Sequence, residues 1–361
     1  MGIDSNASID YVVWRMKYGK CFGMEETMQY PHWLKKGDKI GVTACSDGKP
    51  EAVEQIRMDS AKEQFLQRGF TIQETNDVRT SERGRSAAAE VRAKEFMELV
   101  ENEEIAMVLS ASGGDYLMEV LPFLDYEKIA KHPKWYQGYS DPTGLLYTIT
   151  THCDMATVYG GNYGDFGMRP WHPSLEQNLQ VLQGELALQE SFAAYTDGFI
   201  EKITGYETYR EDKPVYWHTE GKVEAAGRLL GGCLDVLLDL VGTRFDKTKE
   251  WIETYKEDGI LWYLESFALD GGQLTRGLWQ LKEAGWFQYA KGFVFGRPTF
   301  FSSDLELSYE ETVKEMLAPL GVPIIFEADF GHKPPRMTIL NGAYGTVTAE
   351  NGKGTLLQQM K

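Results

Sequence analysis

The segment Gly138-Tyr-Ser-Asp-Pro-Thr143 has the composition of a turn that carries a catalytic serine. It follows the strand-like residues 135–138 and precedes the apolar, helix-like residues 144–151. A tight strand-to-helix turn projects the Oγ of Ser140 outward, and the N–H groups of the following helix can hold an oxyanion. The second glycine of the usual Gly-x-Ser-x-Gly pattern is absent. Ser140 or Asp141 would equally serve as a helix N-cap, so both interpretations stay open.

A serine nucleophile needs an imidazole as its general base. The chain has six histidines, namely His32, His132, His152, His172, His218 and His332. His332 lies in Phe330-Gly-His-Lys-Pro-Pro335, where one glycine and two prolines favour a fixed, accessible loop. His172, within Arg169-Pro-Trp-His-Pro173, is the alternative base. Without further context His332 could also be an ordinary surface histidine in a turn.

The imidazole in turn needs a carboxylate that orients it. Glu265 ends the apolar run 260–264, and Asp270 lies close enough to compete with it. A salt-bridged or helix-capping glutamate is the simpler interpretation of Glu265. Gly113-Gly114 follows another strand-like run and could offer backbone amides to an oxyanion together with Asp141, or could simply make a turn.

Other functional classes find little support in the sequence. Histidines and cysteines show no metal-ligand spacing, and the glycines form no dinucleotide or phosphate-loop motif, so we expect no metal and no cofactor. The net charge of −17, from 37 basic and 54 acidic residues, argues against nucleic acid and membrane surfaces as partners. The polar start, the four scattered cysteines and the lack of a long apolar run predict a cytoplasmic protein with reduced thiols.

The elements that must position these residues alternate between strands and helices. We predict strands at 39–46, 70–73, 105–110 and 135–138 and helices at 50–68, 87–100 and 116–124. This alternation is typical of a parallel sheet covered by helices, and it places Ser140 at the carboxyl end of a strand. A second α/β region follows, with strands at 259–265 and 292–296 and a helix at 272–284.

A chain of 361 residues exceeds the usual size of one hydrophobic core, so two domains are expected. We predict an N-terminal arm (1–32), an α/β domain with the nucleophile (33–170), a linker and aromatic flap (171–222) and a domain with the glutamate and histidine (223–361). Trp171 and Trp217 of the flap are candidate substrate contacts, although aromatic residues more often fill cores.

Six landmarks, in order, resemble the LD-carboxypeptidase family of serine peptidases, which includes the microcin-C self-immunity peptidases. They are Leu34-Lys-Lys-Gly-Asp-Lys-Ile-Gly-Val42, Ser112-Gly-Gly-Asp-Tyr116 with Leu121-Pro-Phe-Leu-Asp-Tyr126, Gly138-Tyr-Ser-Asp-Pro-Thr143, Gly227-Arg-Leu-Leu-Gly-Gly-Cys-Leu234, Ile260-Leu-Trp-Tyr-Leu-Glu265 and Phe330-Gly-His332. The resemblance covers residues 33–347. It departs from the family pattern at Asp115-Tyr116, at Pro142 and at Cys233, and the family usually has Asn at the position of Cys233. These departures spare the three candidate catalytic positions.

The resemblance implies a catalytic Ser140, His332 and Glu265. It also implies an N-terminal flavodoxin- or Rossmann-like parallel-sheet domain, a C-terminal swivelling β-rich α/β domain, a site between them and a homodimer. Two substrate classes follow from it. A murein-derived LD-peptide, as in peptidoglycan recycling, would need an arginine for its carboxylate. The candidates are Arg169, Arg228, Arg244, Arg276, Arg297 and Arg336.

The second class is a peptidyl- or aminoacyl-nucleotide, as in microcin immunity, and the aromatic flap could stack on its base. The aromatic residues between Trp171 and Trp217 favour this class slightly. A non-catalytic module that binds peptides with the same fold is the alternative from a different class.

Overall fold

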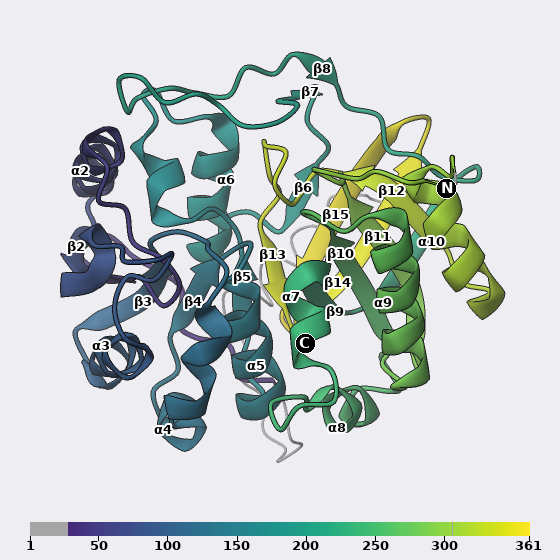
Figure 1. Ribbon diagram of the computed structural model, residues 1–361, viewed down its shortest axis with the longest axis horizontal. Coiled ribbons are helices and arrows are strands. Elements are labelled where there is room, and N and C mark those ends of the chain that lie inside the picture. The colour runs from purple at the N-terminus through teal and green to yellow at the C-terminus, as the bar shows by residue number, and fades with distance from the viewer. Residues whose placement is uncertain (1–27, 305) are drawn as a thin grey trace, which may run out of the picture.

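Two β-sheets lie side by side in the computed structural model of the chain, which describes residues 28–304 and 306–361 (Figure 1). Most of the predicted N-terminal arm, including Tyr11, Trp14 and Tyr18, lies outside the described residues. Within the described ranges, no helix is long and apolar enough to cross a bilayer.

The first sheet is formed mainly by the N-terminal half of the chain. Its strands are β1 (Lys39–Thr43), β2 (Thr71–Glu74), β3 (Ile105–Ser110), β4 (Trp135–Gly138) and β5 (Thr157–Tyr159), and its main helices are α2 (Ala52–Gln67), α3 (Ala89–Glu101), α4 (Tyr126–Lys131) and α5 (Thr143–Cys153). These strands are parallel and run in the order β5-β4-β3-β1-β2. This is the flavodoxin-like order, so the predicted fold of this half is confirmed.

The second sheet has seven strands and belongs to the C-terminal half. Its order is β12 (Ile324–Ala328), β11 (Ala290–Gly296), β10 (Ile260–Glu265), β9 (Val223–Cys233), β14 (Tyr344–Glu350), β15 (Lys353–Gln359) and β6 (Leu188–Glu190), with helices α7 (Leu234–Leu240), α8 (Thr248–Thr254), α9 (Gly271–Glu283) and α10 (Tyr309–Leu317). The first four strands are parallel and the last three antiparallel. The predicted β-rich α/β fold is therefore confirmed.

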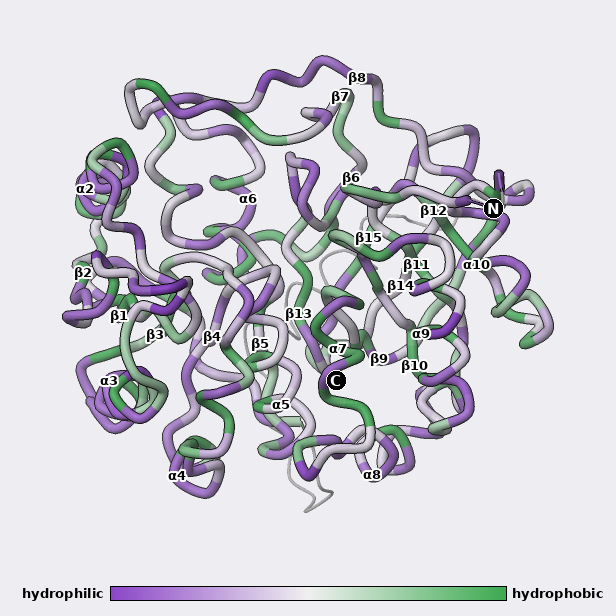
Figure 2. The backbone as a smooth tube through the Cα atoms, in the orientation of Figure 1, coloured by the Kyte–Doolittle hydropathy of each residue, from purple (hydrophilic) through white to green (hydrophobic). Residues whose placement is uncertain are grey.

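Local sequence explains most of these elements. Every residue of β10 is buried, as expected for a parallel strand that is covered on both faces. The outer helix α3 shows both hydrophobic and hydrophilic colours in Figure 2, and its apolar residues Phe96, Leu99 and Val100 are buried, as in an amphipathic helix. Helix α9 begins at a capping box formed by Asp270 and Gln273. Asp270, the alternative to Glu265, is therefore a helix cap.

Two parts of the prediction need correction. Residues 116–124 form two short 3₁₀ helices, Leu117–Glu119 and Leu121–Phe123, instead of one α-helix. Pro122 is the physical reason, because proline has no backbone N–H to donate to the preceding turn. Residues assigned to the flap also contain a regular helix, α6 (Pro173–Leu182).

Each sheet includes one strand from outside its predicted domain. Strand β13 (Ile339–Asn341), from the C-terminal half, pairs antiparallel with β5 of the first sheet. Strand β6, from the predicted linker, forms the edge of the second sheet. The rest of that linker, with β7 (Ala194–Tyr195) and β8 (Lys213–Pro214), spans the top of the molecule between the two halves (Figure 1). The exact domain limits stay a prediction.

One close contact sets the distance between the halves near the candidate site. Gly232 of β9 has a φ of +138°, and a Cβ at this position would lie 2.5 Å from Cγ2 of Thr143. The neighbouring Cys233 N–H donates to Thr143 Oγ1 at 3.2 Å. Thr143 begins α5 immediately after the serine turn, and β9 pairs with the strand that ends at Glu265. This contact therefore aligns Ser140 with Glu265.

We expect Gly232→Ala to lower the free energy of unfolding by about 2 kcal/mol or more, because a methyl group would collide with Thr143 in an unfavourable backbone conformation. Gly242→Ala is the matched control, since Gly242 has a φ of +77° and a Cβ added there would meet nothing within 4 Å. Urea denaturation of both variants measures the difference. Equal losses of stability would show that the contact with Thr143 is unimportant.

Candidate active site

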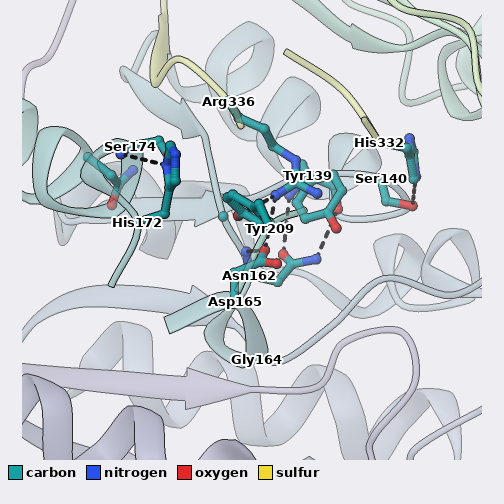
Figure 3. A network of polar contacts seen from close by, with 12 residues as sticks. Tyr139, Ser140, Asn162, Gly164, Asp165, His172, Ser174, Tyr209, His332 and Arg336 are labelled. Atoms are coloured by element: carbon teal, nitrogen blue, oxygen red, sulfur yellow. Dashed lines mark hydrogen bonds and ion pairs between the residues drawn. The ribbon is translucent and has the colours of Figure 1, made fainter. Parts of the chain in front are cut away.

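Ser140 lies in the turn between β4 and α5 in a strained conformation. Its φ is +68°, in the left-handed region that costs a residue other than glycine about 1–2 kcal/mol. Asn162, which follows β5, binds both backbone groups of Tyr139, the residue before Ser140. Its Oδ1 accepts from the Tyr139 N–H at 3.2 Å, and its Nδ2 donates to the Tyr139 carbonyl at 3.3 Å (Figure 3). The turn has the geometry of a nucleophile elbow.

Arg336 supports the same turn from the C-terminal half. Its guanidinium carbon lies 3.9 Å from the centroid of the Tyr139 ring, and its Nε donates to the Gly331 carbonyl at 2.5 Å (Figure 3). Its Nη1 lies 3.5 Å from the Asp165 carboxylate. Arg336 is only 8% exposed, and all of these contacts are with the protein itself. The structure therefore indicates that Arg336 positions Tyr139, while its predicted role in binding a substrate carboxylate stays a prediction.

His332 connects Ser140 with Glu265. Its Nε2 lies 2.9 Å from Ser140 Oγ, and its Nδ1 lies 3.0 Å from Glu265 Oε2. An ionised carboxylate can only accept, so Nδ1 carries the proton and Nε2 is left to accept from the serine hydroxyl. The imidazole therefore has the tautomer that a general base for Ser140 requires.

Glu265 is a fully buried carboxylate with donors on both oxygens. Its Oε1 accepts from the Tyr159 hydroxyl at 2.7 Å, while Oε2 faces His332. Burial alone raises the pKa of Glu265, but the charge and hydrogen bond of His332, with hydrogen bonds from Tyr159 and Cys233, bring this pKa below its ordinary value. Glu265 is therefore ionised at neutral pH and suited to orient the imidazole.

The backbone beside Ser140 offers free donors. A Cβ on Gly113 would lie 2.9 Å from Ser140 Oγ and 3.8 Å from the Asp141 nitrogen. Neither Gly113 nor Asp141 uses its N–H in a hydrogen bond within the described part of the chain. A Cβ on Gly114 would instead collide with Ser46 Oγ, so Gly114 faces the loop after β1. Of the predicted oxyanion donors, Gly113 and Asp141 are therefore the two beside the serine.

The alternative base, His172, serves a structural purpose. It caps α6, with its Nδ1 2.9 Å from Ser174 Oγ, and its Nε2 lies 3.4 Å from Glu211 (Figure 3). Burial lowers the pKa of His172 despite the nearby Glu211 carboxylate. None of these contacts brings it to Ser140.

The two candidate tryptophans of the flap are core residues. Trp171 is 7% exposed and donates to the Phe166 carbonyl at 2.7 Å, while Trp217 is 2% exposed and donates to Asp329 at 3.1 Å. Their large rings are buried and their N–H groups are already hydrogen-bonded, which leaves no ring face free for a ligand. The structure therefore corrects the expectation that Trp171 and Trp217 stack on a substrate.

Two residues of this arrangement were absent from the sequence prediction. Tyr159 ends β5, and Asn162 follows it after two glycines. Both lie at the carboxyl edge of the parallel sheet, where functional residues of such folds gather. This rule identifies them only once the short run Thr157–Tyr159 is recognised as a strand, and no strand is predicted there from the sequence. In residues 28–304 and 306–361 no group of three or more potential ligands could hold a metal ion.

We expect Tyr159→Phe to lower the free energy of unfolding by about 2 kcal/mol at pH 7, because the ionised Glu265 loses one donor. Since the folded-state pKa of Glu265 is lowered, its stabilising contribution is present above the ordinary pKa and is lost as the pH falls through the lowered value. The difference in free energy of unfolding between the wild type and Tyr159→Phe should therefore become smaller as the pH falls. Tyr136→Phe is the control, because the buried Tyr136 hydroxyl has no partner among the described residues. Urea denaturation between pH 3 and 7 measures the free energy of unfolding of both variants. A loss of stability in Tyr159→Phe that does not change with pH would contradict the role of Tyr159 as a donor to ionised Glu265.

Comparisons with known proteins place the chain among peptidases. Residues 40–160 match the LD-carboxypeptidase N-terminal domain, and residues 226–347 match the LD-carboxypeptidase C-terminal domain. The microcin C7 self-immunity protein MccF of Escherichia coli is 28% identical over 340 residues, which cover 90% of this chain and 95% of that protein. A probable murein peptide carboxypeptidase of Bacillus subtilis is 27% identical over 326 residues, which cover 89% of this chain and 92% of that protein.

A solved structure shows the same fold. MccF in complex with aspartyl sulfamoyl adenosine superposes with a TM-score of 0.75 at 23% identity, and the match covers 91% of this chain and 98% of that one. The two domain matches together cover most strands of both sheets, and they include Ser140 in the first domain and Glu265 and His332 in the second. The chain therefore belongs to the LD-carboxypeptidase family of peptidases.

Proposed function

We propose that the chain is a serine-type carboxypeptidase that hydrolyses an amide bond with Ser140, His332 and Glu265. The observation that carries this proposal is the continuous chain of hydrogen bonds from Ser140 Oγ through His332 to Glu265, with distances of 2.9 Å and 3.0 Å. This chain joins a strained turn of the first sheet to a buried carboxylate of the second. A module that only bound peptides would not require such an arrangement.

In the proposed mechanism, Ser140 Oγ attacks the carbonyl carbon of the substrate while His332 Nε2 takes the serine proton. The negative oxygen of the tetrahedral intermediate is held by the N–H groups of Gly113 and Asp141, each worth about 3 kcal/mol to the transition state. Ionised Glu265 stabilises the imidazolium that forms. His332 then gives its proton to the leaving nitrogen, and the C–N bond breaks to leave an acyl-enzyme.

Water completes the reaction. His332 takes a proton from a water molecule that attacks the ester carbonyl of the acyl-enzyme, and the proton returns to Ser140 Oγ as the acid product leaves. Each step uses the same imidazole in the tautomer that Glu265 maintains. No cofactor is required by this sequence of steps.

For the substrate we propose a small peptide from murein or a peptidyl- or aminoacyl-nucleotide. The named relatives support both classes, since one is a probable murein peptide carboxypeptidase and MccF has been solved with aspartyl sulfamoyl adenosine. The family resemblance also supports a homodimer, and the sequence pattern supports a cytoplasmic location; we include both in the proposal. The burial of Trp171 and Trp217 removes these two rings as candidates for stacking on a nucleobase, while Tyr206 and Tyr216 of the same segment are exposed.

The proposal is tested by incubating the protein with a murein tetrapeptide and, separately, with an aminoacyl-sulfamoyl adenosine. Mass spectrometry should detect release of terminal D-alanine or of the nucleoside by the wild type and not by Ser140→Ala. Circular dichroism should show that both proteins are folded. Equal turnover by the two proteins would refute Ser140 as the nucleophile, and silence of both with each substrate would favour the binding module.

The strained backbone of Ser140 leads to a separate prediction. Ser140→Gly should be about 1 kcal/mol more stable than Ser140→Ala, because glycine adopts a φ of +68° without a Cβ penalty. Both variants should lack peptidase activity, so any difference reports the strain alone. Urea denaturation measures it, and equal or reversed stability would show that the turn relaxes when the hydroxyl is removed.

A further inference from the structure

One carboxylate oxygen joins three loops at the carboxyl edge of the first sheet. Oδ2 of Asp141, the residue after Ser140, accepts a hydrogen bond from Ser46 Oγ and another from the Leu117 N–H at 2.9 Å. Ser46 lies in the loop after β1, Leu117 in the segment after β3 and Asp141 in the turn after β4. Since β4, β3 and β1 are neighbours in the sheet, the Asp141 carboxylate links three adjacent loops.

Helix capping does not explain this carboxylate. Helix α5 begins after Pro142, and the Asp141 carboxylate accepts from Ser46 and Leu117 instead of from the first N–H groups of the helix. Asp141 is only 5% exposed, and burial raises the pKa of its carboxyl group because the two hydrogen bonds compensate only in part. A buried carboxylate costs free energy, so its position beside the nucleophile indicates a role other than capping.

Ser46 also packs against the glycine pair of the β3 loop. A Cβ on Gly114 would lie 2.2 Å from Ser46 Oγ, which leaves no space for a side chain at that position. Gly113, the residue before Gly114, lies beside Ser140 Oγ. The buried Ser46 hydroxyl therefore contacts the carboxylate of Asp141 and the residue next to Gly113. These two residues, Gly113 and Asp141, are the candidate oxyanion donors.

A buried arginine fixes the β1 and β3 loops to each other. Nη1 of Arg92, in α3, donates to the Cys45 carbonyl of the β1 loop at 2.8 Å and to the Tyr116 carbonyl of the β3 loop at 3.1 Å. Its Nη2 pairs with Glu119 at 2.7 Å, and the Arg92 side chain is fully buried. The two loops thus form a braced support, and the hydrogen bond from Ser46 attaches the serine turn to it.

We propose that Ser46 is a positioning residue, whose hydrogen bond to the Asp141 carboxylate fixes the spacing between the N–H groups of Gly113 and Asp141. This inference rests on the proposed function, in which these two N–H groups hold the negative oxygen of the tetrahedral intermediate. Donors of this kind stabilise a transition state because they are held in place before the charge develops. Ser46 acts through Asp141 and the glycine pair, and not on the substrate itself.

The test measures how fast Ser140 reacts with a fluorophosphonate probe, whose phosphoryl oxygen takes the place of the oxyanion. Ser140 Oγ displaces fluoride, so that one O–P bond forms and one P–F bond breaks, and intact-mass measurement detects the adduct. Ser46→Ala should lower the labelling rate by about tenfold to a hundredfold, since small displacements of catalytic groups have effects of this size. With a substrate that the wild type cleaves, this variant should lower kcat by a similar factor and leave KM nearly unchanged.

Variants at Asp141 and at a distant serine are the controls. Asp141→Ala should react at least as slowly as Ser46→Ala, and combining the two replacements should cause no further loss, because both remove the same hydrogen bond. Asp141→Asn should retain nearly the wild-type rate, since its amide oxygen can accept from both donors. Ser60→Ala removes a buried hydroxyl of α2 that accepts from Arg169 Nε at 2.6 Å, and it should leave the labelling rate unchanged.

An unchanged labelling rate in a Ser46→Ala variant that circular dichroism shows to be folded would overturn the inference. So would an Asp141→Asn variant as slow as Asp141→Ala, because the charge and not the position would then matter, or a raised KM with unchanged kcat. If Ser46→Ala slows the labelling of Ser140 but the wild type cleaves no peptide or nucleotide substrate, the positioning role holds and the peptidase proposal fails. A wild type that is not labelled on Ser140 would refute both.

Discussion

The ionised carboxylate of Glu265 is the interaction on which the arrangement of the molecule depends. A fully buried charge without partners would cost several kcal/mol, so its two oxygens must find donors. Those donors come from different parts of the fold, because Tyr159 ends a strand of the first sheet and His332 lies in the loop after β12 of the second. The charge is therefore compensated only when the two sheets are docked against each other. Docking the sheets also brings His332 to Ser140.

The strain at Ser140 is maintained by the same docking. A left-handed serine persists only where surrounding contacts determine the backbone, and those contacts come from both halves of the chain. Asn162 holds Tyr139 from within the first sheet, and Arg336 stacks on the Tyr139 ring from the second. Gly232 lets β9 approach Thr143 at the start of α5. The separation of Ser140 and His332 is thus a property of the interface between the sheets.

The sequence predicted what depends on local pattern. Apolar runs located the parallel strands β1 to β4, β10 and β11 but not β5 or β9, and Ser140, Gly113 and Glu265 lie at or just after strand ends as expected. The contacts of Tyr159 and Asn162 could not be predicted from pattern alone, because they join residues far apart in the chain. Trp171 and Trp217 were predicted as substrate contacts but are buried. Composition identifies an aromatic segment but does not distinguish a buried ring from an exposed one. The exposed rings near the site, Phe199 and Phe300, come from separate segments and pack on Phe267, which contacts His332.

The central claim is that His332 activates Ser140 for nucleophilic attack. Its most direct test is covalent labelling by phenylmethanesulfonyl fluoride, followed by intact-mass measurement and peptide mapping of the wild type and of a folded His332→Ala variant. The account predicts a single adduct on Ser140 that forms at a greatly reduced rate in the variant. Labelling of another residue, or an unchanged rate at Ser140 without His332, would contradict it.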